Sequence, residues 1–447
     1  MRFIPHTEPE VRHMLAAVGV EEIEHLFDSI PADARLSRPL DLPRPLSEQE
    51  LFARLRELAA RNATPESHTC FLGAGAYAHF VPSVVSALAS RAEFLTSYTP
   101  YQPEISQGTL QAIFEWQTMI CGITGLEVSN ASLYDGASAT AEAVLMAIRL
   151  TRRHRVLLAG GLHPHWRDVV RTYLQGLDAE VVELGVGTDG RSEPVDSHLD
   201  GEVACVVVQQ PAFLGPVQDL APVAAAAREH GALLVVAVAE ALSLGLLRAP
   251  GELGADIVCG EAQSFGIPLS FGGPHLGFLA ARRRFVRQLP GRLVGETVDA
   301  RGRRGYVLTL STREQHIRRE RATSNICTNQ GLCLLMATIY LSLLGPHGLR
   351  TLARDNLARA HYARTRIAAT PGVELVHPGP VFNEFAVRTD RPPAEILEEG
   401  ASRGLLAGLD LEPHAPELGP ALLVCTTELA SRKEIDRLVN LLGKNRP

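Results

Sequence analysis

Short apolar runs separated by helical patterns fill the middle of this 447-residue chain, and they constrain its fold more than any other feature. The runs lie between residues 130 and 285: Val156–Ala159, Val181–Leu184, Ala204–Gln209, Leu233–Ala239, Ile257–Cys259 and Gly277–Ala280. Helical patterns, such as Trp166–Gln175 and Asp219–His230, lie between several of them. Strands that alternate with helices predict βαβ units, and right-handed crossovers place helices on both faces of a mostly parallel sheet.

The flanking segments have a different pattern. Helical spacing at Glu8–Val18 and Ser47–Arg61 predicts a helical arm. After residue 330 we expect a long buried helix and then alternating helices and strands: Leu332–Leu344, Leu349–Ala369, Val381–Val387, Ala394–Arg403, Leu422–Thr426 and Arg432–Leu442. The predicted division is therefore an N-terminal helical arm (1–60), a large α/β domain (61–330) and a small C-terminal α+β domain (331–447).

Net charge and cysteine spacing narrow the possible functions. A formal charge of −7 argues against general binding to nucleic acid or to an anionic membrane. The longest nearly apolar run, Gly331–Gly345, is shorter than the roughly 20 residues of a membrane span. Met1–Glu10 does not have the pattern of a secretory signal. Seven scattered cysteines without a C-x-x-C pair predict reduced thiols in the cytoplasm and no zinc site.

The lysine content excludes one kind of chemistry. Of the 43 Lys and Arg residues only two are lysines, Lys433 and Lys444, and both lie close to the end of the sequence. Arginine stays protonated and cannot act as a Schiff-base nucleophile, so it cannot replace a catalytic lysine. We expect that any activity that needs a lysine in the middle of the chain is absent.

A glycine-rich stretch, Phe71–Ala78, matches G-x-G-x-x-A, a pattern typical of dinucleotide binding. Its context is unfavourable, because the preceding strand would be short and Pro82 interrupts the following helix. A glycine-rich turn is the default interpretation, and a nicotinamide-dependent enzyme is an alternative.

Two further motifs could contact a ligand of the α/β domain. Asp135, Gly136 and Ser138 stand at the start of a predicted helix, whose first N–H groups could cradle a phosphate or could simply be capped. His163 follows a predicted strand, at the edge where α/β sheets bind ligands, and could stack on a ring or be structural. His163 and His165 lack the cysteine or acidic residues that would complete a metal site, so we predict no metal.

Residues 97–108 are a third candidate. This segment is rich in aromatic and polar residues and has no periodicity, which predicts an ordered loop. Four of its side chains could form one wall of a site, unless the segment is a plain loop: Tyr98, Tyr101, Gln102 and Glu104. Further along, the mixed-charge run Arg313–Arg321 predicts a solvated or interface helix face.

Four segments resemble the P-protein of the glycine cleavage system: Tyr98–Gly108, Tyr134–Ala143, Phe271–His275 and Thr312–Thr328. The similarity runs nearly end to end, and the length resembles that of the alpha chain, subunit 1, in the two-subunit form of this family. The resemblance implies the aspartate-aminotransferase-like fold of pyridoxal-phosphate (PLP) enzymes, fold type I. This fold agrees with the arm, the α/β domain with its mostly parallel sheet and the small α+β domain that the patterns predict.

The same resemblance implies that this chain has no cofactor site of its own. Gln263 stands where the catalytic partner would have its Schiff-base lysine. An aspartate that holds the pyridine nitrogen would be expected near the end of Leu233–Ala239, but only Val and Ala stand there, up to Glu240. The vestiges of a lost PLP site would be Asp135, Gly136, Ser138 and His163.

The resemblance also implies partners. PLP would lie on the beta subunit of an alpha2beta2 complex, where glycine is decarboxylated and the remaining aminomethyl group passes to the lipoyl arm of the H-protein. Sites of this fold lie at a dimer interface, so we expect this chain, inactive alone, to contribute residues to the partner's site: Tyr98, Tyr101, Gln102 and Glu104. Two alternatives are an assembly subunit without any catalytic residue and a self-sufficient PLP enzyme that uses Lys433 or Lys444.

Overall fold

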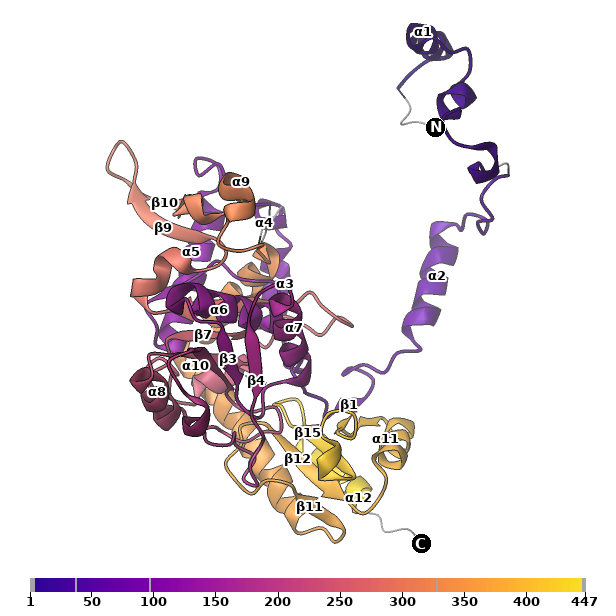
Figure 1. Cartoon of the computed structure of the whole chain (residues 1–447). Helices are drawn as coiled ribbons and strands as arrows, with labels where there is room; N and C mark the ends of the chain where they lie inside the picture. Colours follow the sequence, from indigo (N-terminus) through magenta and orange to yellow (C-terminus); the bar gives the residue numbers. More distant parts are fainter. Residues whose placement is uncertain (1–4, 37, 96–97, 327–328, 444–447) are drawn as a thin grey trace. The chain divides into compact units, whose positions relative to one another are not determined.

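The computed structural model describes residues 5–36, 38–95, 98–326 and 329–443, and the chain separates into two compact units, Met1–Asn62 and Ala63–Pro447 (Figure 1). The second unit contains both the large and the small predicted domains. The predicted boundary at residue 330 is not tested by this grouping and stays a prediction. Lys444 lies outside the described residues.

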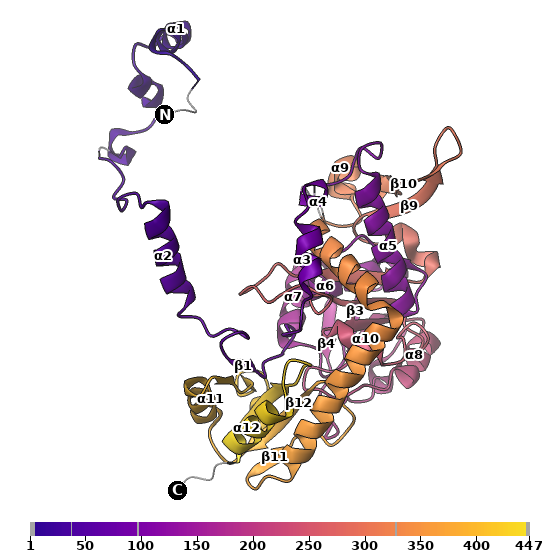
Figure 2. The ribbon, with the colours of Figure 1, turned by 180° about the vertical axis from the view of Figure 1, so that it is seen from behind.

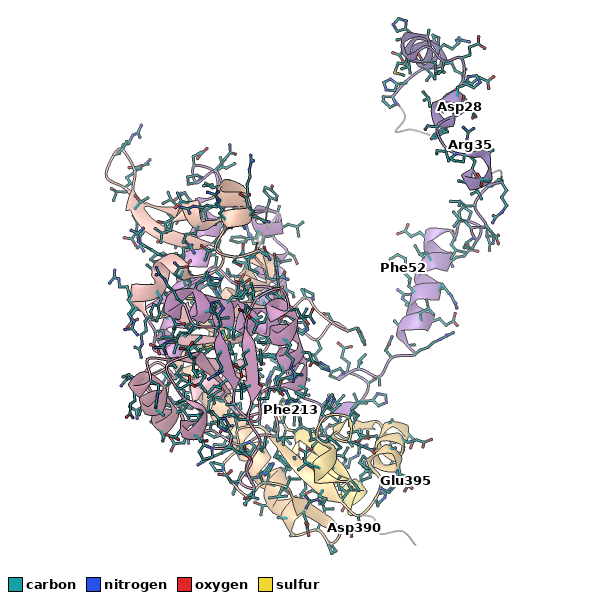
Figure 3. All side chains as sticks on the ribbon, in the orientation of Figure 1. Asp28, Arg35, Phe52, Phe213, Asp390 and Glu395 are labelled. Carbon is teal, nitrogen blue, oxygen red and sulfur yellow. The ribbon has the colours of Figure 1, made fainter. Side chains whose placement is uncertain are left out.

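The first unit contains two α-helices, α1 (Glu8–Val18) and α2 (Glu48–Ala59), close to the predicted spans. Ser47 caps α2, because its hydroxyl accepts a hydrogen bond from the Glu50 N–H at 3.3 Å while the Glu50 carboxylate accepts from the Ser47 N–H at 2.8 Å. Arg35 and Asp28 form an ion pair at 3.0 Å. Several apolar side chains of α2 are exposed, including Phe52, which Figure 3 labels.

A seven-stranded sheet forms the centre of the second unit. Its spatial order is β2 (Val128–Ser129), β8 (Gly277–Ala281), β7 (Ile257–Glu261), β6 (Leu233–Val238), β5 (Val203–Gln209), β3 (Arg155–Leu158) and β4 (Glu180–Glu183). The pairs from β7 to β4 are parallel, whereas β8 pairs antiparallel with both β7 and β2. The α/β class with a mostly parallel sheet is therefore confirmed.

Helices cover both faces of this sheet, because its strands have apolar side chains on both sides. One face packs against α6 (Gly136–Thr151) and α7 (Pro164–Leu174), which lie in front in Figure 1. The other face packs against α5 (Gln107–Thr124), α8 (Leu220–Glu229) and α10 (Gly331–Ala368), and Figure 2 shows α5 and α10 from that side. Strand β5 is buried along its whole length, as expected of a central parallel strand.

Helix α10 contributes to the core of the seven-stranded sheet and to the core of the small antiparallel sheet. The sequence predicted two helices here, and they form one element with a kink at Gly345, where φ is 58° and Pro346 follows. By length and composition α10 could also cross a membrane. Its first half packs in the core of the large domain through Cys333, Leu334, Ala337 and Tyr340, which explains its apolar composition.

The small domain is built on a four-stranded antiparallel sheet in the order β11 (Val373–Leu375), β12 (Glu384–Thr389), β15 (Ala421–Cys425) and β14 (Leu409–Asp410). The second half of α10, α11 (Pro393–Ser402) and α12 (Arg432–Leu442) share a core with it. The predicted strand Val381–Val387 begins later, at Glu384, because Val381 instead forms an isolated bridge to Pro216. Strand β1 (Thr69–Cys70) pairs in parallel with β13 (Leu405–Leu406).

Four elements outside these layers lie close to the predicted loop. They are α3 (Ser83–Ala89), α4 (Ala92–Leu95), the antiparallel hairpin of β9 (Leu293–Val298) and β10 (Arg304–Thr309), and the short helix α9 (Gln315–Arg318). The Gln107 side chain exchanges two hydrogen bonds with the Tyr306 backbone, at 2.8 and 2.9 Å. This pair ties the start of α5, and with it the loop before α5, to β10.

Candidate functional site

The start of α6 is bonded to carboxylates of this chain. Asp135 caps the helix, since its Oδ1 accepts a hydrogen bond from the Ser138 N–H at 2.7 Å. The Gly136 N–H donates to Glu261 Oε2 at 3.0 Å. Glu261, at the end of β7, is buried, and its other oxygen accepts from the N–H groups of Gln263 and Leu276 at 3.0 and 2.9 Å. Burial raises the pKa of Glu261. Two N–H groups that could hold a phosphate therefore already have carboxyl groups of this chain as partners.

Gln263, predicted to stand at the lysine position, is a buried structural amide. Its Oε1 accepts a hydrogen bond from the Tyr77 N–H at 2.9 Å, and its Nε2 donates to the Ile267 carbonyl at 2.6 Å. Its own N–H is taken by Glu261. The side chain thus joins the glycine-rich segment to the turn after β7.

Glu240, two residues after the end of β6, is paired with a histidine that follows the glycine-rich stretch. His79 Nε2 lies 3.0 Å from Glu240 Oε2, and His79 Nδ1 lies 2.8 Å from Glu428 Oε2, with all three side chains almost entirely buried. Asn356 donates to Glu428 at 3.0 Å, and Asn383 donates to Glu240 at 3.3 Å. Both imidazole nitrogens therefore face a carboxylate, which is the environment of an imidazolium cation.

The electrostatics of this triad agree with the geometry. Burial by itself would lower the pKa of His79, but the charges and hydrogen bonds of Glu240 and Glu428 outweigh it and raise the pKa to about 9. Burial would raise the pKa of Glu428, but the bonds and charge of His79, with the Phe80 N–H, lower that pKa to about 2. An internal cation thus lies beside Glu240, near the strand end where the resemblance implies an aspartate for the pyridine nitrogen.

Little free space remains around Tyr77, Glu240 and Glu384. Tyr77 donates to Glu384 at 3.1 Å, and the Ala74 N–H donates to the same carboxyl group at 2.6 Å. Burial raises the pKa of Glu384 to about 8. A cavity lined by Tyr77, Glu240 and Glu384 has a volume of about 10 Å³, which is room for at most one water molecule.

His163, for which the sequence left open a ring-stacking or a structural role, contacts groups of the protein. Its Nε2 is 2.9 Å from the Ala74 carbonyl, and its Nδ1 accepts from the His165 N–H at 3.2 Å. Its ring stacks with Trp166 at 5.8 Å and meets Phe213, labelled in Figure 3, edge-on at 4.9 Å. Burial lowers the pKa of His163 to about 4, so the imidazole is neutral.

The described residues do not fit PLP. Gln263 replaces the lysine, and Lys433, the lysine that the structure describes, is exposed on α12. The start of α6 is bonded to Asp135 and Glu261, and His79 takes the carboxylate after β6. The self-sufficient PLP alternative is left without a described amine at the site.

The glycine-rich stretch also lacks a dinucleotide-binding context. Strand β1 before it has two residues, and the next helix, α3, begins only at Ser83. Between them, Ala74 and Gly75 have φ angles of 57° and 94°. The stretch is a glycine-rich turn, as the default interpretation predicted.

The four loop residues lie at the surface, and one of them contacts a distant motif. Tyr98, Tyr101, Gln102 and Glu104 are exposed. The Tyr101 hydroxyl accepts a hydrogen bond from Arg292 at 3.0 Å, and its ring meets His316 edge-on at 5.3 Å. The structure therefore brings Tyr101 to the mixed-charge run. It does not test whether the loop faces a partner.

Sequence reasoning missed several residues of these networks: His79, Glu261, Arg292, Glu384 and Glu428. Each is a charged or titratable residue with an apolar neighbour in sequence, and no local pattern marks it as buried. The contacts span long stretches of chain, 349 residues between His79 and Glu428. The one available signal was Glu240, the acidic residue directly after an apolar strand.

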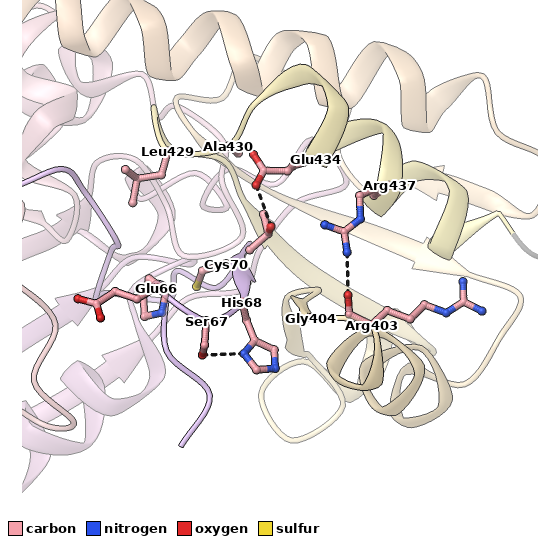
Figure 4. Close-up of a pocket in the computed structure, with 12 residues that line it drawn as sticks. Glu66, Ser67, His68, Cys70, Arg403, Gly404, Leu429, Ala430, Glu434 and Arg437 are labelled. Atoms are coloured by element: carbon pink, nitrogen blue, oxygen red, sulfur yellow. Dashed lines mark hydrogen bonds between the residues drawn. The ribbon is translucent and has the colours of Figure 1, made fainter. Parts of the chain in front are cut away.

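A second hollow, of about 320 Å³, lies between residues 65–70 and the ends of α11 and α12 (Figure 4). Several of its polar groups already have partners: Thr69 donates to Glu434 at 3.0 Å, and Arg437 donates to the Arg403 carbonyl at 2.7 Å. No predicted site residue lines it. In the described ranges, no group of three or more His, Cys, Asp or Glu side chains is arranged to hold a metal ion.

The sheet, its two helical layers and the small antiparallel domain define the class: this is the fold of PLP-dependent enzymes of fold type I. A C-DES mutant with glycine covalently linked to its PLP cofactor has the same fold, with a TM-score of 0.63 at 16% identity over 86% of this chain and 98% of that one.

Sequence and structure comparisons also identify the family of this chain. Residues 1–442 match the family described as glycine cleavage system P-protein. The chain is 52% identical over 445 residues, 99% of each chain, to the probable glycine dehydrogenase (decarboxylating) subunit 1 of Desulforamulus reducens. A crystal structure of glycine decarboxylase (P-protein) of the glycine cleavage system, in inhibitor-bound form, covers 99% of each chain with a TM-score of 0.89 and 48% identity. This chain belongs to the glycine cleavage system P-protein family.

Proposed function

We propose that this chain is the alpha subunit of a two-subunit glycine dehydrogenase (decarboxylating) and that it acts in glycine decarboxylation without binding PLP itself. Its relatives are named as subunit 1 of that enzyme. The observation that supports the second part is that Gln263, Glu261 and His79 are each bonded to groups of this chain, at positions where the family resemblance would put the contacts of the cofactor.

The PLP-binding partner is then a beta subunit, in an alpha2beta2 complex, and the aminomethyl group passes to the lipoyl arm of the H-protein. The name subunit 1 supports a partner chain. This chain's part is to complete the partner's site with an exposed loop: Tyr98, Tyr101, Gln102 and Glu104. The tie between Gln107 and Tyr306 supports an ordered loop, because it holds the start of α5 to β10.

The experiment is native mass spectrometry of the complex, with an absorbance spectrum of the same sample and of this chain alone. We expect an alpha2beta2 mass with one PLP per beta chain, and no PLP absorbance from the isolated chain. A homodimer of this chain with its own lysine-bound PLP would overturn the proposal.

A purely structural subunit is the second candidate, favoured by the closed interior of this chain. Tyr101→Phe and Glu104→Gln, measured in the assembled complex, separate the two candidates. A lower kcat/KM for glycine with intact assembly supports the interface site, whereas an unchanged kcat/KM for both variants supports the structural role.

A further inference from the structure

Residues that are far apart in sequence meet in a network of four polar side chains: Tyr101, Arg292, Glu314 and His316. Arg292, just before β9, donates through Nη2 to the Tyr101 hydroxyl at 3.0 Å, and its guanidinium carbon lies 5.4 Å from the centre of the Tyr101 ring. Arg292 Nε is 3.2 Å from Glu314 Oε2. His316 Nδ1 is 3.7 Å from the same carboxylate oxygen, and its ring contacts Tyr101.

Within this network the side chains of Arg292 and Glu314 are buried, whereas the side chain of Tyr101 is exposed. The side chains of Arg292 and Glu314 are 4% and 6% exposed, whereas Tyr101 is 42% exposed. Arg292 Nε and Nη1 and Glu314 Oε1 are buried without a hydrogen-bond partner among the described residues, so Arg292 and Glu314 are joined as an ion pair. Burying such a pair costs free energy that exposed charges would not cost. A purely structural explanation is therefore weak, since a neutral pair could fill the same space.

Hydrogen bonds hold the backbone segments that carry Arg292 and Glu314. Arg313, next to Glu314, donates to the carbonyls of Leu289 and Gly291, immediately before Arg292. The Ala131 N–H donates to the Arg292 carbonyl at 2.8 Å. Arg292 and Glu314 are thus fixed relative to the sheet, and the tyrosine that they contact is fixed with them.

The direction of the hydrogen bond from Arg292 to Tyr101 determines whether the Tyr101 hydroxyl is free to donate a hydrogen bond of its own. A guanidinium group has only donors, so the phenol oxygen must accept from it. The phenol O–H then points elsewhere, and the neighbouring cation polarises it as a donor. A ligand's ammonium group would be repelled by Arg292, whereas an oxygen acceptor would be attracted.

We infer that Arg292, held by Glu314, is a positioning residue that orients the Tyr101 hydroxyl outward to donate a hydrogen bond to the carboxylate of the amino-acid substrate in the partner's site. This rests on the proposed function, and it extends that function by naming the substrate group that Tyr101 recognises. Glycine has this carboxylate. Methylamine has the amino group of glycine without the carboxylate, so it serves as the matched probe.

The test uses the complex of this chain with its PLP-binding partner and measures KM and kcat for glycine and competitive inhibition by methylamine. Tyr101→Phe is expected to raise the KM for glycine about 10- to 100-fold, as expected for one lost hydrogen bond to a charged group, with a much smaller change in kcat. The inhibition constant of methylamine should not change.

The positioning role is tested with Arg292→Gln and, because that change leaves Glu314 buried and unpaired, with the charge-neutral double variant Arg292→Gln/Glu314→Gln. Each should raise the KM for glycine to a similar extent as Tyr101→Phe, with no further rise when Tyr101→Phe is added. Arg304→Gln is the matched control, because Arg304 lies over the Tyr306 ring and pairs with Glu296 on the same hairpin.

The outcomes separate the two levels of the argument. If the wild-type complex is inactive, or the partner alone is fully active, the proposed function fails. If the wild-type complex needs this chain but Tyr101→Phe leaves the KM unchanged, or shifts methylamine and glycine equally, carboxylate recognition is refuted. If the charge-neutral variant behaves as wild type, or its effect adds fully to that of Tyr101→Phe, Arg292 does not position Tyr101.

Discussion

Replacing His79 by glutamine removes the cation from the buried triad and leaves Glu240 and Glu428 facing each other. The two carboxylates lie 3.0 and 2.8 Å from the imidazole nitrogens, and the imidazole side chain is 2% exposed. Solvent cannot reach the gap to screen the repulsion. We therefore expect His79→Gln to destabilise the fold strongly near neutral pH.

The magnitude follows from the pKa of the histidine. A rise from 6.5 in the unfolded chain to about 9 in the folded chain corresponds to about 3 kcal/mol, since each pKa unit is worth about 1.4 kcal/mol. Breaking a buried ion pair by removing one partner costs a similar amount, about 3–5 kcal/mol. A loss of about 3 kcal/mol is a large fraction of the stability of a typical domain.

The stability that His79→Gln loses should decrease as the pH rises. Because the pKa of His79 is higher in the folded state, its stabilising contribution is complete below pH 6.5 and is lost as the pH rises through about 9. The stability difference between wild type and His79→Gln should therefore be greatest near about pH 6 and should shrink toward about pH 10.

The assay is urea unfolding of the full-length chain at several pH values, followed by the fluorescence of Trp116 and Trp166. His361→Gln, at an exposed position of α10, is the matched control and should lose little stability at any pH. A loss below about 1 kcal/mol for His79→Gln near pH 6 would refute the ion-triad reasoning. So would a loss that stays constant from about pH 6 to about pH 10.

Three other changes test the filled interior. Gln263→Lys, incubated with PLP and then freed of unbound PLP, should show no absorbance from protein-bound PLP, because groups of the chain still occupy the other positions that the cofactor would contact. A spectrum of protein-bound PLP would contradict this. Gly136→Ala should lower the thermal midpoint by several degrees, since the added Cβ would lie 2.5 Å from the Trp166 ring; Gly122→Ala, with open space around it, should not. Burial raises the pKa of Glu384 to about 8, so the wild type loses stability as the pH rises from 4.5 to 8, and Glu384→Gln should gain relative stability across that range in the same urea assay.

The central sheet was predictable because its strands are continuous apolar runs. β5 and β6 are buried along their whole length, and a buried parallel strand leaves a clear signal in the sequence. The helix Gln107–Thr124 was not predicted, although it packs Leu110, Ile113 and Trp116 into the core, because the polar residues before it and in its first turn obscure where its 3.6-residue period begins. The partly exposed hairpin β9–β10 carries charges of both signs and has no such signal.

The candidate site was predictable only at positions that local sequence marks. Gln263 and Asp135 follow or precede recognisable elements, so their places near the strand ends could be foreseen. The pairing of Gly136 with Glu261 joins residues 125 positions apart, and the link from His79 to Glu240 spans 161. Such contacts depend on the packing of two sheets and a connecting segment, which periodicity does not contain.

The filled interior has a consequence for how this subunit is made. An enzyme that takes up a cofactor gains stability by mass action, in proportion to the logarithm of the cofactor concentration above its dissociation constant. Here a stretch of the chain itself, Ala74–His79, supplies the contacts at that place. Each polypeptide carries one copy of this stretch, which cannot be diluted or depleted. Under the proposed function, the stability of this subunit is therefore independent of how well the cell is provided with vitamin B6, and the chain can fold completely before a PLP-binding partner has taken up its cofactor.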